Sequence, residues 1–160
     1  MRSGRKGVFV WVVFVCAVGV RSAGAQCSVT ATNISFGSYD VFSSTPRTAT
    51  GTITVDCDMA PPPDVIIQIG PSAHSGSFNP RQMKHVARPD RLNYNLFTDP
   101  TMTTIWGDGT SGTATRTCEQ VVKPKPCTQT VYALLPAGQD VAVGPYQDVV
   151  TVTIIVVPKK

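Results

Sequence analysis

Cysteine is the residue type here whose number and spacing most clearly predict a chemistry. Four cysteines follow residue 26, and an even number in an exported chain is typical of disulfide bonds. Four cysteines allow three pairings. We favour the one that ties two early strands together and closes a second, short loop around a Lys-Pro-Lys-Pro segment. The favoured pairs are Cys27–Cys57 and Cys118–Cys127.

A zinc site built from the same cysteines is the alternative. Structural zinc sites usually contain a C-x-x-C pair, often with a histidine nearby, and this sequence has neither arrangement. The two histidines, His74 and His85, lie in a stretch rich in glycine, serine, proline and arginine, which indicates a surface loop. We therefore expect no metal site and no cofactor.

Sequence patterns of familiar catalytic sites are absent. The chain has no G-x-S-x-G, no H-E-x-x-H, no phosphate-binding loop and no G-x-G-x-x-G, so we expect no catalytic residues and no enzyme activity. Trp106 and Asp108 form a possible ligand-contact loop, because an exposed tryptophan favours an adhesive or carbohydrate-contacting surface. The alternative is that Trp106 plugs the end of a sandwich and that Asp108 serves a turn.

The N-terminal segment predicts export. Arg2, Arg5 and Lys6 precede an apolar run over residues 8–20, and the small-x-small pattern of Ala23-Gly24-Ala25 suits signal peptidase. The run is shorter than the roughly 20 residues that a membrane-spanning helix needs, which disfavours the alternative of a retained anchor. We interpret residues 1–25 as a signal peptide and residues 26–160 as the mature chain.

Removal of this leader changes the charge of the protein. Four of the 14 basic residues lie in the leader and none of the ten acidic residues does, so the mature chain has a formal net charge near zero. No basic patch remains to suggest nucleic acid as a partner.

The mature sequence reads as short strands separated by turn residues. Runs of β-branched and alternating residues are bounded by glycine, proline, serine and asparagine, and no window keeps a helical period. About seven strands in one domain predict an all-β, immunoglobulin-like antiparallel sandwich. The expected runs are residues 29–36, 48–55, 65–69, 92–97, 130–135 and 146–157.

The last of these runs is unusual because it is long, β-branched and without charge from Val149 to Val157. One interpretation is an ordinary central strand. The other is an open sheet edge, which pairs readily with another chain. In the second case one face of the strand forms a strand-acceptor groove, lined by Val150, Val152, Ile154 and Val156.

Ordered blocks over nearly the whole mature chain resemble the spore coat protein U domain family. Each block is short, but together they follow the family's order. The blocks are Cys27-Ser28-Val29, residues 36–40, residues 51–57, residues 92–99, residues 105–109, Val131-Tyr132-Ala133, residues 136–139 and residues 144–153.

The family includes secreted spore-coat proteins and subunits of archaic chaperone–usher pili. The resemblance implies an incomplete sandwich that lacks its final strand. It also implies a periplasmic chaperone, an outer-membrane usher and other coat or pilus subunits as partners, with export to the cell surface or spore coat. A neighbouring subunit would supply the missing strand through an N-terminal extension.

One departure from the pilus pattern concerns that extension. Cys27 follows the predicted cleavage site by one residue, so the mature chain has nothing to donate. We therefore expect a structural coat or surface subunit that accepts a strand. The alternative is a tip adhesin of a chaperone–usher pilus, which serves attachment and biofilm formation; no small-molecule substrate is expected.

Overall fold

The computed structural model describes residues 8–18 and 26–159, and all regular structure in them is β. None of the described segments is a helix of the length and apolarity required to cross a membrane. The strands are β1 (Val8–Val18), β2 (Gln26–Ala31), β3 (Ile34–Tyr39), β4 (Arg47–Asp58), β5 (Asp64–Ile69), β6 (Arg81–His85), β7 (Arg91–Phe97), β8 (Arg116–Cys118), β9 (Cys127–Leu135) and β10 (Tyr146–Val157).

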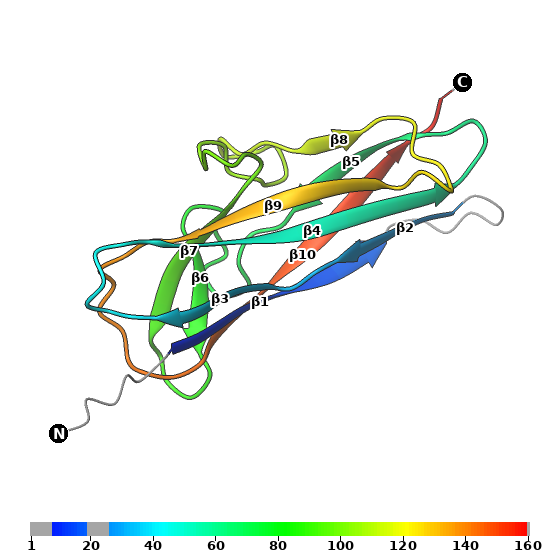
Figure 1. Ribbon diagram of the computed structural model, residues 1–160. Helices are drawn as coiled ribbons and strands as arrows, with labels where there is room; N and C mark the ends of the chain where they lie inside the picture. The colour runs from blue at the N-terminus through cyan, green and yellow to red at the C-terminus, as the bar shows by residue number, and fades with distance from the viewer. Residues whose placement is uncertain (1–7, 19–25, 160) are drawn as a thin grey trace.

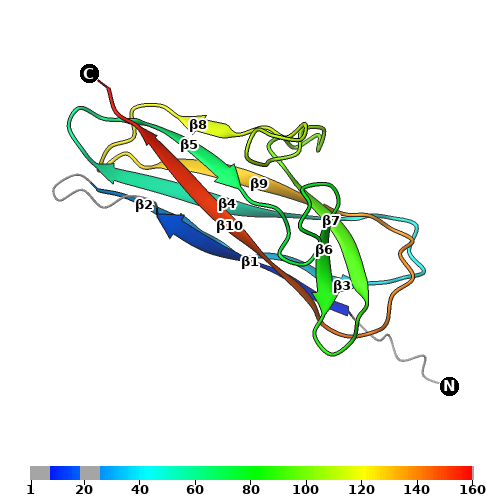
Figure 2. The same ribbon diagram turned by 180° about the vertical axis from the view of Figure 1, so that it is seen from behind.

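The strands form one curled sheet that folds into two facing layers (Figure 1). The first layer has the order β2-β4-β9-β7, and the second contains β3, β1, β10, β5 and β8. The hairpin of β6 and β7 joins the layers at one end, because β6 pairs with β10 while β7 pairs with β9. Seen from behind, β10 runs diagonally between β1 and β5 (Figure 2).

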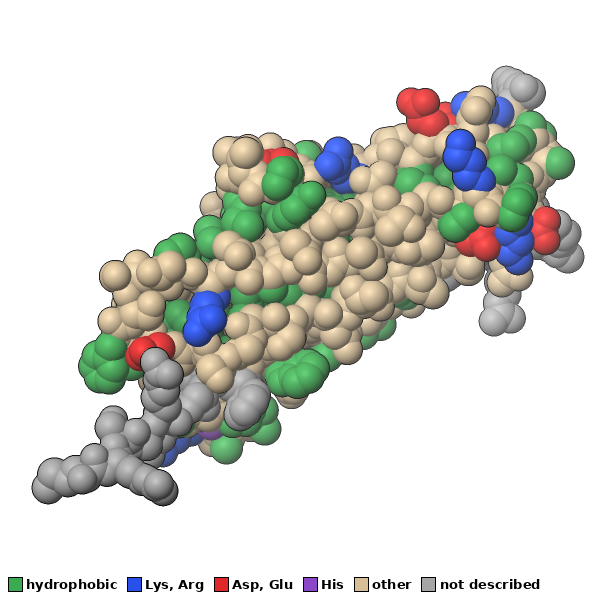
Figure 3. All heavy atoms as spheres, in the orientation of Figure 1, with side chains coloured by type: hydrophobic (Ala, Val, Ile, Leu, Met, Phe, Trp, Pro, Cys, Tyr) green, Lys and Arg blue, Asp and Glu red, His purple; other side chains and the backbone are tan. Residues whose placement is uncertain are grey.

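Alternation of side chains along the strands builds the core between the layers. In β4 the residues from Gly51 to Cys57 alternate between buried and half-buried positions, as expected for a strand with one face in the core. The outward face of this layer carries mostly threonine and other uncharged polar groups. Figure 3 shows this face largely free of charge along its middle, with charged side chains gathered toward the ends of the molecule.

The all-β prediction is confirmed, and five of the six expected runs lie within strands of the structure. The run over 29–36 divides into β2 and β3. Sequence reasoning missed three described strands. β1 lies in the predicted leader, β8 has three residues, and β6 carries three basic residues, Arg81, Lys84 and His85, in a turn-rich stretch.

Candidate functional site

The candidate functional site is a groove between β3 and β10, in which β1 lies. β1 runs parallel to β10, from the pair Val10–Tyr146 to the pair Val18–Ile154, and antiparallel to β3. It therefore has a hydrogen-bonded neighbour on each side, an interior position in the sheet. Its residues belong to the segment predicted to be a signal peptide; residues 1–7 and 19–25 of that segment lie outside the described residues.

The groove receives alternate side chains of β1. Val10 and Val12 are fully buried, and Phe14 and Cys16 are partly buried against the core. The intervening residues Trp11, Val13 and Val15 project outward and are 49%, 37% and 49% exposed. The site thus binds an apolar strand through every second residue, the recognition that an exposed sheet edge offers to an added strand.

β10 forms one wall of the groove. Val150, Val152 and Ile154, three of the residues expected to line it, are buried in one row. Val156 is half-buried and pairs with Val65 of β5, beyond the described end of β1 at Val18. The structure agrees with the interpretation of this run as a central strand, and the open edge stays a prediction that depends on the loss of β1. β10 is central, with β5 and β6 on one side, and in the described chain its other edge is covered by β1.

β3 forms the opposite wall and has anchors that do not involve β1. Its first residue, Ile34, packs over Gly51 of β4, where an added Cβ would lie 2.7 Å from Cγ1 of Ile34. At the other end, the hydroxyl of Tyr39 donates to the carbonyl of Pro136 at 3.0 Å and accepts from the amide of Gln139 at 2.9 Å. These contacts hold β3 to the first layer, although β1 is its one ladder partner among the described strands.

Asp148 is a groove residue that sequence reasoning missed. It lies in the buried row of β10, paired with Val12 of β1, and its side chain is fully buried. The hydroxyl of Tyr94 donates to Oδ2 at 2.7 Å, and Nε2 of His74 lies 3.9 Å from Oδ1. Burial raises the pKa of the Asp148 carboxyl. Its position could have indicated burial, because Asp148 lies two residues before Val150 and therefore on the same face of an alternating strand.

Tyr146 extends the same row and was also missed. Its hydroxyl donates to the carbonyl of Ala142 at 2.8 Å, and burial raises its pKa to about 12. The ring of His85 meets it edge-on, with centroids 5.0 Å apart. His85 is buried on β6, so the prediction that it lies in a surface loop is wrong. Gly144, at a φ of +148°, leaves room for that ring, since a Cβ there would lie 2.1 Å from Nε2.

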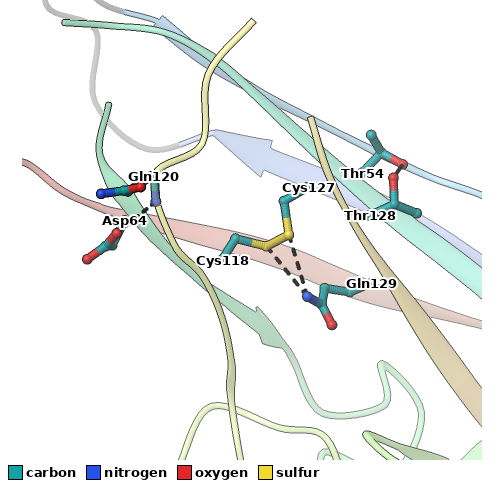
Figure 4. The surroundings of a disulfide bond; sticks show 7 residues. All are labelled: Thr54, Asp64, Cys118, Gln120, Cys127, Thr128 and Gln129. Carbon is teal, nitrogen blue, oxygen red and sulfur yellow. Dashed lines mark hydrogen bonds between the residues drawn. A yellow bond between two sulfur atoms is a disulfide. The ribbon is translucent and has the colours of Figure 1, made fainter. Parts of the chain in front are cut away.

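The two disulfides are the pairs that the sequence favoured. Cys27–Cys57 joins directly opposed residues of β2 and β4. Cys118–Cys127 joins β8 in the second layer to β9 in the first, with the amide of Gln129 3.5 Å from the sulfur of Cys127 (Figure 4). In the part of the chain that is described, no cluster of three histidine, cysteine or acidic side chains could hold a metal ion.

The loop of Trp106 and Asp108 has a structural explanation. Trp106 is fully buried, and its indole nitrogen donates to the carbonyl of Ile67 at 3.1 Å, so its burial favours the core role over ligand contact. Asp108 accepts hydrogen bonds from the hydroxyl and amide of Thr110, at 2.7 and 2.9 Å, and these lower its pKa. Trp106 thus attaches the loop to β5, and Asp108 stabilises the turn that follows.

These features define a class of protein: an all-β, immunoglobulin-like sandwich whose second layer is completed by an inserted strand. The sequence matches the Spore Coat Protein U domain over residues 14–153, and the chain belongs to that family. Protein U of Myxococcus xanthus is 31% identical over 147 residues, which cover 87% of this chain and 76% of that protein. Membership indicates a spore coat or pilus-type surface protein.

Proposed function

We propose that residues 26–160 form a secreted structural subunit of a bacterial surface or spore coat. The subunit assembles by accepting a strand from a partner into the groove between β3 and β10. One observation carries the proposal. The strand that fills the groove, β1, comes from the segment whose basic start, apolar run and small-x-small end predict removal during export.

The energetic consequence of that removal is large. Loss of β1 uncovers a row of buried side chains on β10 and leaves backbone groups of β3 and β10 without their ladder partner. Full burial of a valine-sized side chain contributes about 1.5–3 kcal/mol, and among the side chains of β1 that the structure describes, those of Val10 and Val12 are fully buried. A groove opened in this way favours recruitment of another apolar strand.

The expected partners are the proteins that would fill the open groove during export and assembly. A periplasmic chaperone would cover the groove during transit, and an outer-membrane usher would exchange it for another coat or pilus subunit at the surface. The family is structural, and we propose no enzymatic reaction for this chain.

The alternative function is a tip adhesin of a chaperone–usher pilus, serving attachment and biofilm formation. It is supported by the start of β2 at Gln26, the first residue of the predicted mature chain. A mature subunit without an extension ahead of β2 can accept a strand but cannot donate one, which suits the end of a fibre. Loss of attachment on deletion of this chain, with shafts still present, would favour the adhesin.

The test compares the mature chain with and without a donor peptide. Residues 8–18 are synthesised with Cys16→Ser and lysine tails for solubility. They are mixed with residues 26–160 and followed by size-exclusion chromatography and thermal denaturation. We expect the free chain to aggregate or unfold readily, and the peptide to convert it into a stable one-to-one complex.

The control peptide carries Val10→Asp and Val12→Asp, which places charge at the two fully buried positions without changing length. It should neither bind nor stabilise. A mature chain that is already monomeric and stable, and indifferent to both peptides, would overturn strand acceptance.

A further inference from the structure

A cavity of about 300 Å³ lies against the outer side of β7, next to β9. None of its lining residues comes from β1 or β10, so it is separate from the strand groove. Its walls combine apolar side chains with amide groups, the composition typical of small-molecule sites, and its volume is at the lower end for such sites. The lining residues used below are Asn79, Asn93, Asn95, Phe97, Ile105 and Leu134.

A hydrogen-bond relay from Arg81 orients two of these amides. Nη1 of Arg81 donates to Oδ1 of Asn95 at 2.9 Å, and an arginine can only donate. The amide nitrogen of Asn95 therefore faces Asn79, and it donates to Oδ1 of that residue at 3.2 Å. The NH₂ group of Asn79 is left as a donor, and among the described residues no acceptor lies within hydrogen-bond distance of it.

A second relay begins at Arg91 and ends in the same way. Nη1 of Arg91 donates to Oε1 of Gln82 at 3.4 Å, and Nε2 of Gln82 donates to Oδ1 of Asn93 at 2.9 Å. The NH₂ group of Asn93 likewise finds no acceptor in the described part of the chain. In both relays the amide oxygen already accepts one hydrogen bond, and the NH₂ group of the last asparagine is left as a donor at the cavity.

Charges of both signs lie near the cavity: the guanidinium of Arg81, which interacts with the carboxylate of Asp148, and the carboxylate of Asp99, which is hydrogen-bonded to the lining residue Thr103. Arg81 is fully buried, and no carboxylate of the described residues lies within 4.0 Å of it. Burial lowers its pKa to about 10, so it stays charged at neutral pH. The nearby acid Asp99 directs both carboxylate oxygens to the hydroxyl and amide groups of its own loop, at Thr103 and Thr104.

We propose that this cavity binds a carboxylate-bearing sugar unit, such as a uronic acid residue of an acidic polysaccharide. The asparagine NH₂ groups favour a ligand with acceptor oxygens, and the guanidinium of Arg81, which donates to protein groups behind the lining, contributes a positive charge. The apolar walls at Phe97, Ile105 and Leu134 suit the C–H face of a pyranose ring. The proposal does not depend on strand acceptance, and it gives the surface protein a means to hold an acidic polysaccharide.

The test measures binding of trigalacturonate and of its fully methyl-esterified form, which has the same skeleton without charge. Titration is done on the chain with its groove filled, as full-length protein or as the peptide complex. We expect trigalacturonate to bind at least ten-fold more tightly than the ester, and its affinity to fall with added salt. Asn93→Asp turns the cavity-facing donor into an acceptor, so it should lower trigalacturonate affinity by at least ten-fold.

Asn33→Asp is the matched control, since it makes the same change of charge in the exposed loop between β2 and β3, outside the cavity. Thermal denaturation of both variants checks that they fold. Equal affinity for the acid and the ester, equal losses in the two variants, or no binding of either ligand would each overturn the proposal. So would equally tight binding of a short peptide with a free C-terminal carboxylate, because the cavity would then not select a sugar.

Discussion

The two layers of the sandwich are held together in different ways. In the first layer, β2, β4 and β9 pair along long ladders, and the Cys27–Cys57 disulfide crosses one of them. In the second layer the position between β3 and β10 is taken by β1, a strand predicted to be lost at export. Under the proposed function, the first layer is the complete layer of the mature chain, and the second is the incomplete layer, which accepts a strand from a partner.

The rows of side chains that β10 and β4 direct into the core differ in composition. The second layer contains Asp148, a carboxylate in the floor of the groove with Tyr94 as its hydrogen-bond donor. The corresponding inward positions of β4 are Ile53, Val55 and the disulfide-bonded Cys57. The row of β10 beside β1 thus includes a buried carboxylate, whereas the inward row of β4 is apolar and ends at a disulfide.

The largest effect that tests this comparison is expected from Val12→Asp in the full-length chain. The new carboxylate would enter a fully buried position paired with Asp148, where desolvation and like-charge repulsion add. We expect the free energy of unfolding, measured by denaturant titration, to fall by about 4 kcal/mol or more.

Val13→Asp is the companion variant, because Val13 lies one residue along β1 and projects outward. It should cost less than about 1 kcal/mol. Similar losses in the two variants would show that β1 does not hold this register in solution.

The next effect concerns the two disulfides. Replacing Cys27 and Cys57 by alanine opens a loop of sequence separation 30, and loop entropy predicts a cost of about 3–4 kcal/mol. Replacing Cys118 and Cys127 opens a separation of 9 and should cost about 2–3 kcal/mol. Unfolding of both double variants under oxidising conditions gives the comparison. A larger loss for the second pair would mean that the link between the layers outweighs the link within the complete layer.

The complete layer could be predicted largely from sequence, and the groove only in part. Alternation in residues 48–55 and 130–135 shows a strand with one face in the core, so β4 and β9 were expected close to their observed bounds. β1 was not expected, because an apolar run without alternation does not distinguish a leader from a strand. The choice between them depends on contacts with β3 and β10, which are distant in sequence.

The error at His85 has a physical cause that also applies to Arg81, for which no prediction was made. Both residues lie on β6 in a stretch rich in turn residues, and the composition of that stretch led to the prediction of a surface loop for His85. Both are buried. Backbone carbonyl groups accept hydrogen bonds from Arg81, and the ring of Tyr146 packs against His85. Asp148 was passed over for the same reason. Burial of a polar residue can be predicted only when its hydrogen-bond and packing partners are known. These partners come from strands that are distant in sequence.

The pH dependence of stability gives a finer test of the incomplete layer. Burial raises the folded pKa of Asp148 above its ordinary value of 3.8, so the folded chain holds this proton more tightly than the unfolded chain. Its contribution is therefore most favourable below that ordinary value, and stability is lost as pH rises through the window up to the folded pKa. Asp148→Asn removes this loss and retains an acceptor for Tyr94.

We expect denaturant titrations between about pH 3 and pH 8 to show little difference between Asp148→Asn and wild type at the acid end, with the variant gaining relative stability as pH rises. His74→Gln is the parallel control for the neighbouring imidazole, 3.9 Å from the carboxylate. A difference that does not change with pH would contradict a raised pKa for Asp148.

The smallest effect is expected on the outer face of the complete layer. The hydroxyls of Thr54 and Thr128 lie 3.0 Å apart across β4 and β9, one of several polar contacts on this threonine-rich face. Thr54→Val removes the hydrogen bond, keeps the β-branched shape and leaves a neighbouring hydroxyl that water can satisfy. We expect a change of less than about 1 kcal/mol in denaturant unfolding. A loss comparable with that of Val12→Asp would mean that the outer face of the complete layer, and not the filling of the groove, dominates the stability of the fold.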